Sequence, residues 1–206
     1  MGDPIENCLA FIKTSDGGKT WKKVNCDVLP KVSEGEAAFA TSNTNLTIKG
    51  KSIFMVSGGK KSRVFVSKDF GVTWKVYETP IVQGEEMTGI FTADFYNKKI
   101  GIIAGGNYMK QDQNWANKAI TKNGGKTWKL IADKEAFGYA SCVQFVPNSK
   151  GKKIIAVGGT GLYYTSDFGK SWLKFSDEKD FYTFRFASET VFYASGKNKV
   201  ARFEIK

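Results

Sequence analysis

The hydrophobic positions of this chain fall in short runs separated by glycine and polar residues, which is typical of β-strands. Ser52–Val56, Ile100–Ala104 and Ile154–Val157 are each long enough for one strand. None of the runs is long enough to cross a membrane as a helix. The pattern therefore predicts an all-β chain built from many short strands.

Four copies of one eight-residue phrase lie between these runs. The phrase is Ser/Thr-x-Asp/Asn-x-Gly-x-Ser/Thr-Trp, and its copies are Thr14–Trp21, Ser67–Trp74, Thr121–Trp128 and Thr165–Trp172. Successive tryptophans lie 53, 54 and 44 residues apart. Such a period, with short strands, indicates a β-propeller with one blade per repeat.

The residue types of the phrase fit a tight turn between two strands. The Asp or Asn side chain accepts hydrogen bonds from backbone N–H groups two or three residues on, and the glycine permits a positive φ. The tryptophan offers a large apolar surface for packing between blades. One carboxylate in so short a loop does not suit calcium, so we predict no metal site. The residues expected in these structural roles are Asp16, Trp21, Asp69, Trp74, Asn123, Trp128, Asp167 and Trp172.

The phrase resembles the Asp-box, or bacterial neuraminidase repeat, of sialidases, sortilin-type receptors, xyloglucan-active endoglucanases and photosystem II assembly factors. Gly35–Phe39, Gly84–Glu86 and Ser141–Asn148 make the chain most similar to bacterial propellers related to the photosystem II assembly factor. Those proteins are often labelled "oxidoreductase". The resemblance extends over the whole chain. It implies a seven-bladed, sialidase-like propeller and an exported bacterial protein.

The strand pattern divides a single domain of residues 1–206 into blade segments of four antiparallel strands. The segments are 1–30, 36–80, 88–133, 139–177 and 181–206. Only 13 residues precede the first phrase, and the last segment has none, so we expect a partial arc of four to five blades. The resemblance implies that amino-terminal blades are missing before Met1; a ring closed from about four blades alone is the alternative. An open arc would leave strand edges free for oligomerisation.

Two of the three cysteines can meet across the first predicted hairpin. If Thr14 pairs with Thr20, Cys8 falls opposite Cys26, where a disulfide is possible. A bulge in the hairpin would leave them apart. A disulfide would indicate an oxidising compartment, in agreement with the periplasmic or secreted location that the resemblance implies. Cys142 lies in an inner strand and is predicted to be a buried thiol.

The net charge of +11 comes from 31 basic and 20 acidic residues. Only Arg63, Arg185 and Arg202 are arginines, and the lysines are scattered over predicted turns and outer strands. Nucleic-acid readers favour arginine forks and clustered basic faces, so we predict no nucleic-acid partner. Weak attraction to acidic glycans or lipid head groups stays open.

The chain lacks the residues that several classes of enzyme require. The chain has no histidine, which removes Ser-His and Cys-His catalysis. The glycines of Gly158–Gly161 join strand to strand, whereas a nucleotide-binding loop precedes a helix, so no cofactor is predicted. Sialidase chemistry needs an arginine trio, but Arg63 and Arg202 fall on outer strands. A carboxylate pair that hydrolyses a glycoside remains an alternative.

The candidate binding residues lie at the mouth of the predicted central channel. Loops leading into the innermost strands carry Glu36, Glu85, Glu86, Tyr139 and Tyr182. Aligning these strands on Phe95, Phe145 and Phe186 puts Asp94, Gln144 and Arg185 at one equivalent position. These side chains either bind a partner or cap strands and pair with each other.

The long loop 107–117 carries Tyr108 and Trp115, which either dock a sugar or protein or pack over the blade. We expect a non-catalytic scaffold that binds another protein or a glycan, with a carbohydrate-active module as the alternative. A pocket holding two carboxylates about 5–10 Å apart would favour hydrolysis. A broad mouth with an aromatic patch and no such pair would favour partner binding.

Overall fold

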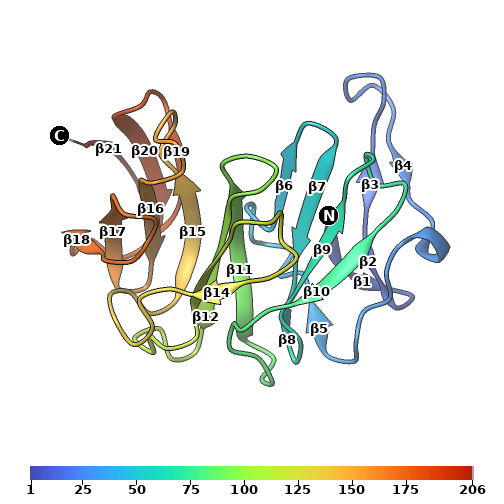
Figure 1. The fold of residues 1–206 in the computed structure, drawn as a ribbon, viewed down its shortest axis with the longest axis horizontal. Coiled ribbons are helices and arrows are strands. Elements are labelled where there is room, and N and C mark those ends of the chain that lie inside the picture. The colour runs from blue at the N-terminus through green and yellow to red at the C-terminus, as the bar shows by residue number, and fades with distance from the viewer. Residues whose placement is uncertain (206) are drawn as a thin grey trace.

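The computed structural model describes residues 1–205, and these residues form an all-β arrangement of antiparallel sheets. The sheets lie side by side in an arc, from the amino-terminal hairpins to the carboxyl-terminal sheet (Figure 1). The only helix of the described chain is the 3-10 turn Cys26–Val28, so no helix there could cross a membrane. The predicted fold class is confirmed.

The strands follow one another in simple meanders. The first unit consists of the pairs β1 (Gly2–Ile5) with β2 (Cys8–Ala10) and β3 (Ile12–Lys13) with β4 (Lys22–Lys23). The second sheet contains β6 (Leu46–Lys49), β7 (Ser52–Val56), β9 (Arg63–Ser67) and β10 (Lys75–Glu78). The third contains β11 (Thr88–Phe95), β12 (Gly101–Asn107), β13 (Lys118–Thr121) and β14 (Lys129–Leu130). The fourth contains β15 (Ala140–Phe145), β16 (Ile154–Gly158), β17 (Gly161–Thr165) and β18 (Leu173–Ser176), and the fifth β19 (Phe181–Phe186), β20 (Val191–Gly196) and β21 (Lys199–Glu204).

The inner edge of the second sheet is interrupted. The short strand β5 (Glu36–Ala37) pairs with β8 (Gly58–Gly59), and β8 also pairs with β11 of the third sheet. Residues 38–45 leave the sheet before β6 resumes beside β7. Asn45 holds this excursion in place, because its side-chain amide donates to the carbonyl oxygens of Ala38 and Phe39.

Alternating side chains on each central strand fill the spaces between neighbouring sheets. On β7, Ile53 and Met55 pack against the first unit, whereas Phe54 and Val56 pack against the third sheet. Two further apolar clusters fill the interfaces between the third and fourth sheets and between the fourth and fifth sheets. Because both faces of a central strand are buried, its sequence is almost continuously apolar.

Each repeated phrase closes a turn between the third and fourth strands of its unit. Asp69 accepts hydrogen bonds from the backbone N–H of Thr73 (2.9 Å) and Val72 (3.1 Å) and from the Thr73 hydroxyl (2.5 Å). Gly71 has a φ of 81°. The acceptor thus reaches residues three and four places on, one further than the two or three places predicted. The other turns have the same i to i+4 bond, at Asp16, Asn123 and Asp167.

Three of the four tryptophans of the phrases pack edge-on against an aromatic ring at a sheet interface. The pairs are Trp74 with Phe11 (5.8 Å between centroids), Trp128 with Phe95 (6.0 Å) and Trp172 with Phe137 (4.9 Å). Trp21 is 58% exposed, because none of the described residues forms a sheet on its outer side. Its indole N–H still donates to Gly18, as in the other turns.

Cys8 and Cys26 form a disulfide, and Cys142 is a buried free thiol. The hairpin register that suggested the bond is wrong, however. Ile12 pairs with Lys23 and Lys13 with Lys22, one residue out of step with the predicted pairing of Thr14 with Thr20. Cys8 instead pairs with Ile5 on β1, and the 3-10 turn carries Cys26 back to it. The disulfide therefore ties this turn to the β1–β2 hairpin.

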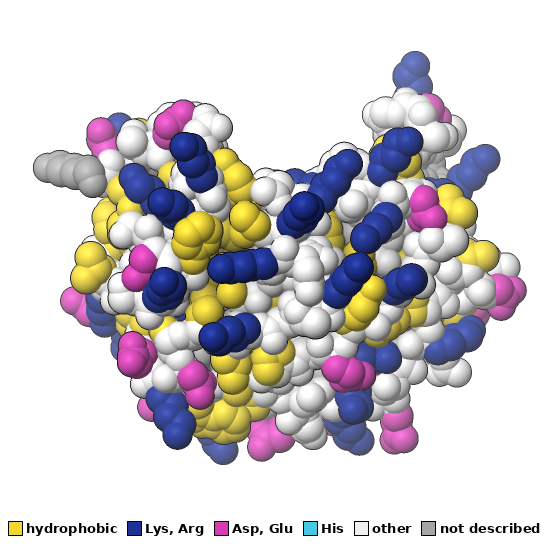
Figure 2. Space-filling model, viewed as in Figure 1, with side chains coloured by type: hydrophobic (Ala, Val, Ile, Leu, Met, Phe, Trp, Pro, Cys, Tyr) yellow, Lys and Arg dark blue, Asp and Glu magenta, His cyan; other side chains and the backbone are white. Residues whose placement is uncertain are grey.

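Basic side chains predominate on the face that presents β10 and β14 (Figure 2). Exposed lysines follow three of the phrase tryptophans: Lys22 on β4, Lys75 on β10 and Lys129 on β14. The lysines lie apart from one another between uncharged side chains, and the described residues contain no arginine cluster among them.

Candidate functional site

The inner strands of the third, fourth and fifth sheets carry a β-bulge at the same place. The register of each strand skips one residue, and the skipped residues are Phe91, Ser141 and Tyr182. The partner strand has a glycine next to the bulge: Gly105, Gly158 or Gly196. A Cβ on any of these glycines would collide with the carbonyl oxygen of the residue two places before the bulged one, which is Gly89, Tyr139 or Asp180. The glycines therefore let the inner strand bend, and a bend re-aims one side chain.

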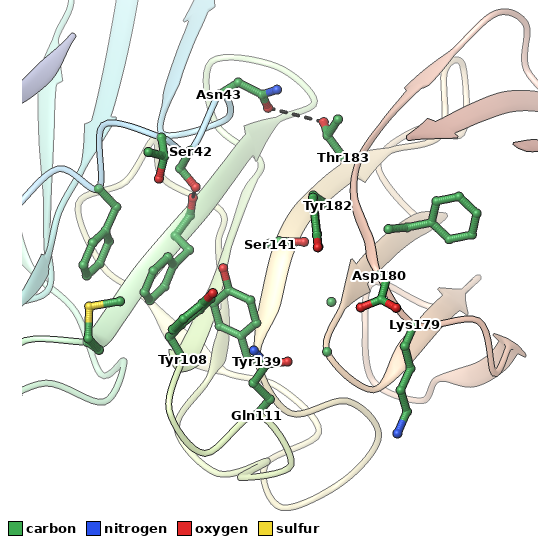
Figure 3. A pocket seen from close by; sticks show the side chains of 17 residues that line it. Ser42, Asn43, Tyr108, Gln111, Tyr139, Ser141, Lys179, Asp180, Tyr182 and Thr183 are labelled. Carbon is green, nitrogen blue, oxygen red and sulfur yellow. Dashed lines mark hydrogen bonds between the residues drawn. The ribbon is translucent and has the colours of Figure 1, made fainter. Parts of the chain in front are cut away.

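The bulge residues of three sheets meet in one cavity of about 740 Å³, which we call the aromatic hollow (Figure 3). Phe39, which has a φ of 50° and follows β5, supplies the corresponding side chain from the second unit. Strand starts and the loop 107–117 complete the lining. Its principal residues are Phe39, Ser42, Asn43, Met87, Phe91, Tyr108, Gln111, Tyr139, Ser141, Asp180, Tyr182 and Thr183.

A connected group of aromatic rings forms one wall of the aromatic hollow. Phe39 stacks on Phe91 with 3.9 Å between centroids, and Tyr139 meets Phe91 edge-on at 4.9 Å. Tyr108 then meets Tyr139 edge-on at 5.3 Å. Opposite this wall, Tyr182 is 54% exposed. Such rings offer a large apolar surface with few rotatable bonds, which suits binding.

Tyr139 has an unused hydroxyl group at this wall. The residue is only 8% exposed, yet its hydroxyl makes no hydrogen bond within the described chain. The hydroxyl is not sealed off, because no fully buried polar side-chain atom of residues 1–205 lacks a partner. Burial, with a smaller contribution from Tyr108, raises the pKa of Tyr139 above its ordinary value of 10.0. The phenol is therefore neutral and able to donate or accept a hydrogen bond.

Asp94, Gln144 and Arg185 meet in a second, smaller cavity of about 230 Å³, which we call the polar hollow. Asp94 links two sheets, since its carboxylate accepts from the backbone N–H of Phe95 and of Phe145, both at 2.8 Å. Burial raises the pKa of Asp94, and these two hydrogen bonds oppose the shift. Both carboxylate oxygens are thus engaged in structure.

A hydrogen-bonded bridge separates the two hollows. Asn43 Oδ1 accepts from the Thr183 hydroxyl (3.3 Å; Figure 3) and from the Arg185 guanidinium (3.3 Å). Arg185 also donates to the backbone oxygen of Phe184 at 2.6 Å. The bridge joins the excursion 38–45 to the inner strand of the fifth sheet, which lies 140 residues later in the chain.

The three predicted glutamates lie outside both hollows. Glu36 is buried and forms an ion pair with Arg63, and it also accepts from the Ser57 hydroxyl (2.5 Å) and the backbone N–H of Ser33 (2.8 Å). Glu85 accepts from the Asn107 amide at 3.2 Å, and Glu86 is exposed. Of the other candidates, Tyr139 and Tyr182 line the aromatic hollow and Asp94, Gln144 and Arg185 line the polar hollow.

Sequence reasoning missed Phe39 and the bulge residues Phe91 and Ser141. The alignment on Phe95, Phe145 and Phe186 contained a signal, because Phe91, Ser141 and Tyr182 each lie four places before the anchor. Strict strand alternation assigns these residues to the wrong face, and only the bulge turns them into the hollow. Of the two aromatic residues singled out in the loop 107–117, Tyr108 lines the hollow, and Trp115 is 46% exposed and lines neither cavity.

Each hollow has a single carboxylate among its lining residues, Asp180 in the aromatic hollow and Asp94 in the polar hollow. Within residues 1–205, no group of three or more Cys, Asp or Glu side chains is placed to hold a metal ion. The site therefore offers aromatic surface and isolated polar groups for binding.

No family model matches the chain. An oligoxyloglucan-reducing end-specific xyloglucanase of Emericella nidulans is 29% identical over 126 residues, which are 55% of this chain and 14% of the xyloglucanase. The crystal structure of the Niastella koreensis GH74 enzyme is similar with a TM-score of 0.54 and 15% identity, covering 76% of this chain and 27% of that one. YCF48 from Cyanidioschyzon merolae gives a TM-score of 0.44 at 13% identity, over 94% of this chain and 76% of YCF48. The chain thus spans about a quarter or less of the xyloglucanase and the GH74 enzyme, and the structural likeness shows the fold alone.

Proposed function

We propose that this chain is a non-catalytic propeller scaffold that binds a protein partner in the aromatic hollow. The observation that carries the proposal is the composition of the hollow, a wall of aromatic side chains with one carboxylate, Asp180, in its lining. Tyrosine and phenylalanine are enriched at protein interfaces, and tyrosine is among the residues that most often contribute strongly to binding. The resemblance of the repeated phrase to the Asp-box of photosystem II assembly factors supports an assembly role.

The carboxylates do not support a hydrolase. Glycoside hydrolysis uses two carboxyl groups on either side of the bond that breaks. Asp94 is bound by two backbone N–H groups and lies in the other hollow, behind the Asn43 bridge. Asp180 therefore has no partner carboxylate among the residues that line the aromatic hollow.

A carbohydrate-binding or carbohydrate-active module is the second candidate. The 29% identity to a xyloglucanase favours it, and exposed tyrosines also stack on sugar rings. The matched region is a small part of that enzyme, so its activity does not follow for this chain. Under this alternative the ligand would be a neutral glycan lying across Tyr108 and Tyr182.

We also propose that the protein works in the periplasm or outside the cell. The disulfide between Cys8 and Cys26 supports this location, because such bonds persist in oxidising compartments.

A selection from a displayed peptide library tests the proposed function. The immobilised protein should enrich peptides, and replacing both Tyr108 and Tyr182 by Ala should weaken the best one by at least about tenfold, as for hot-spot residues. Fluorescence polarisation of the labelled peptide measures the affinity. Tyr193→Ala is the matched control, because Tyr193 is 48% exposed on β20 and lines neither hollow. Equal binding by the double variant, or release of reducing ends from xyloglucan by the wild-type protein, would contradict the proposal.

A further inference from the structure

The four side chains that converge from successive units are three aromatic residues and one serine. Phe39, Phe91 and Tyr182 occupy three of the positions, and Ser141 occupies the fourth, between Phe91 and Tyr182 in chain order. The strand that carries Ser141, β15, packs beside both β11 and β19. A row of rings is therefore interrupted at its third member.

Ser141 does not fill the space that its neighbours' rings occupy. Its side chain is short, and its hydroxyl donates to the backbone oxygen of Val157 at 3.2 Å. The serine thus binds its own sheet and presents a short side chain where Phe91 and Tyr182 present rings. We call the part of the aromatic hollow next to Ser141 the Ser141 gap; Phe91, Tyr139 and Tyr182 line the same hollow.

We propose that the Ser141 gap receives one aromatic side chain from an acidic segment of the partner protein. This inference rests on the proposed function and names the chemistry of its ligand. A ring entering the gap would complete the interrupted row, where the existing rings already pair edge-on and stacked. The Tyr139 hydroxyl, which is accessible and has no partner within the described chain, would pair with a polar tip such as that of tyrosine.

Two polar groups beside the gap are already engaged. The Ser42 hydroxyl donates to the backbone oxygen of Phe91 (2.7 Å), and Asn43 Oδ1 accepts from Thr183 and Arg185. The hydroxyls of Tyr108, Tyr139 and Tyr182 make no hydrogen bond within the described chain, so they can pair with polar atoms of the ligand.

Charge complementarity favours acidic flanks on the ligand. The chain carries a net charge of +11, and the two charged residues that line the aromatic hollow, Lys179 and Asp180, balance each other, so the excess of positive charge comes from the rest of the chain. Lysines also predominate on the face shown in Figure 2. A segment with Asp or Glu on either side of its aromatic residue would be attracted by this field.

Filling the gap is the direct test. Ser141→Phe places in the fourth sheet the residue that the third sheet carries at the same bulge. The probe is the capped peptide Asp-Glu-Tyr-Glu-Asp, with Ala in place of Tyr as its control, and two-dimensional NMR of the protein amides is the readout. The Tyr peptide should shift the amides of Tyr139, Ser141 and Tyr182, and Ser141→Phe should weaken binding at least about fivefold.

Ser166→Phe is the matched control variant, since Ser166 is exposed in a turn of the same sheet and makes no side-chain hydrogen bond within residues 1–205. It should bind the probe like the wild-type protein. Unchanged binding by Ser141→Phe, equal binding of the Ala peptide, or shifts of these amides by a xyloglucan heptasaccharide and not by the Tyr peptide would overturn the inference. A peptide selected from the library could lose affinity when Tyr108 and Tyr182 are replaced and still bind Ser141→Phe like the wild-type protein. This result would overturn the inference about the Ser141 gap and would leave the proposed function unaffected.

Discussion

At the residue scale, the buried Lys118 is an unusual component of the third sheet. It has no solvent exposure, and its ammonium group donates to Asn117 Oδ1 (2.9 Å) and to the backbone oxygen of Glu135 (2.8 Å). The same group lies 4.8 Å from the centre of the Phe137 ring. These contacts hold the segment that follows β14 against the sheet. Burial lowers the pKa of Lys118 from 10.5 to about 8.

This lowered pKa predicts that Lys118 makes stability depend on alkaline pH. Between pH 8 and 10.5 the unfolded chain keeps a proton that the folded chain has lost, so raising the pH favours folding. The unfolding free energy of the wild-type protein minus that of Lys118→Met should rise by about 2 kcal/mol between pH 7 and 10. Urea titrations at several pH values measure it.

The comparison with Lys118→Met is needed because two other groups make the unfolding free energy fall as the pH rises. Burial raises the pKa values of Cys142 and Tyr139, so their contributions fall as the pH rises past the values of the unfolded chain. Both groups are present in each protein and cancel in the difference. If the unfolding free energies of the two proteins changed with pH in parallel, the pKa of Lys118 would be the same in the folded and unfolded chains, which would contradict the prediction.

At the scale of the element, the four phrase turns are stabilised by the same few atoms. Hydrogen bonds, of which the one from the Thr73 hydroxyl has the largest effect, lower the pKa of the Asp69 carboxyl from 3.8 to about 2. Asn123 replaces the carboxylate in the third turn and accepts the corresponding backbone bond at 3.0 Å. The turn therefore depends on an acceptor oxygen more than on a charge.

We predict that Asp69→Ala lowers the melting temperature and that Asp69→Asn lowers it much less. The alanine leaves the N–H groups of Val72 and Thr73 without their acceptor, whereas the amide keeps it. The stabilisation by the ionised Asp69 is present above pH 3.8 and is lost as the pH falls through about 2. The melting temperature of Asp69→Ala should therefore lie closer to that of the wild-type protein at pH 2 than at pH 7. Calorimetry at pH 7 and at pH 2 measures both effects. Equal melting temperatures for the two variants would contradict the acceptor role.

The turns and strands could be predicted because their causes are local. The Asp, Gly and Trp of each phrase lie within six residues, and the apolar runs directly report burial. The inner surface depends on distant partners. Nothing near Phe91 in the sequence shows that Gly105 lets its strand bulge, and nothing near Glu36 shows that Arg63, 27 residues later, neutralises it. The predicted residues of the inner strands therefore line the two hollows, whereas Glu36 and Glu85 bind neighbouring side chains outside them.

At the scale of the whole molecule, the first unit is attached less extensively than the others. It has two short hairpins where the second, third and fourth units each have four strands, and its tryptophan is exposed. One apolar cluster joins it to the second sheet, and Asp3 accepts from the backbone N–H of Ala38 at 3.0 Å. The disulfide closes a loop with a sequence separation of 18 within this unit.

Removing the disulfide should therefore destabilise the protein, and the first unit should unfold most readily. Loop-closure entropy for such a separation corresponds to about 3 kcal/mol. A variant with both Cys8 and Cys26 replaced by Ser should unfold at lower denaturant, with faster hydrogen exchange concentrated in residues 1–30. Cys142→Ser, which retains the disulfide, controls for loss of a sulfur. Uniform exchange along the chain in the double variant would show that the first unit does not open separately.

The bulges have a consequence for how this protein could diversify. Each one turns a single side chain toward the aromatic hollow, and the identity of this side chain matters little to the framework, because Phe, Ser and Tyr all occur at the position in the same molecule. The residues that the framework does require are the glycines on the partner strands. Substitutions at these three codons could thus alter ligand preference one residue at a time while the architecture stays intact.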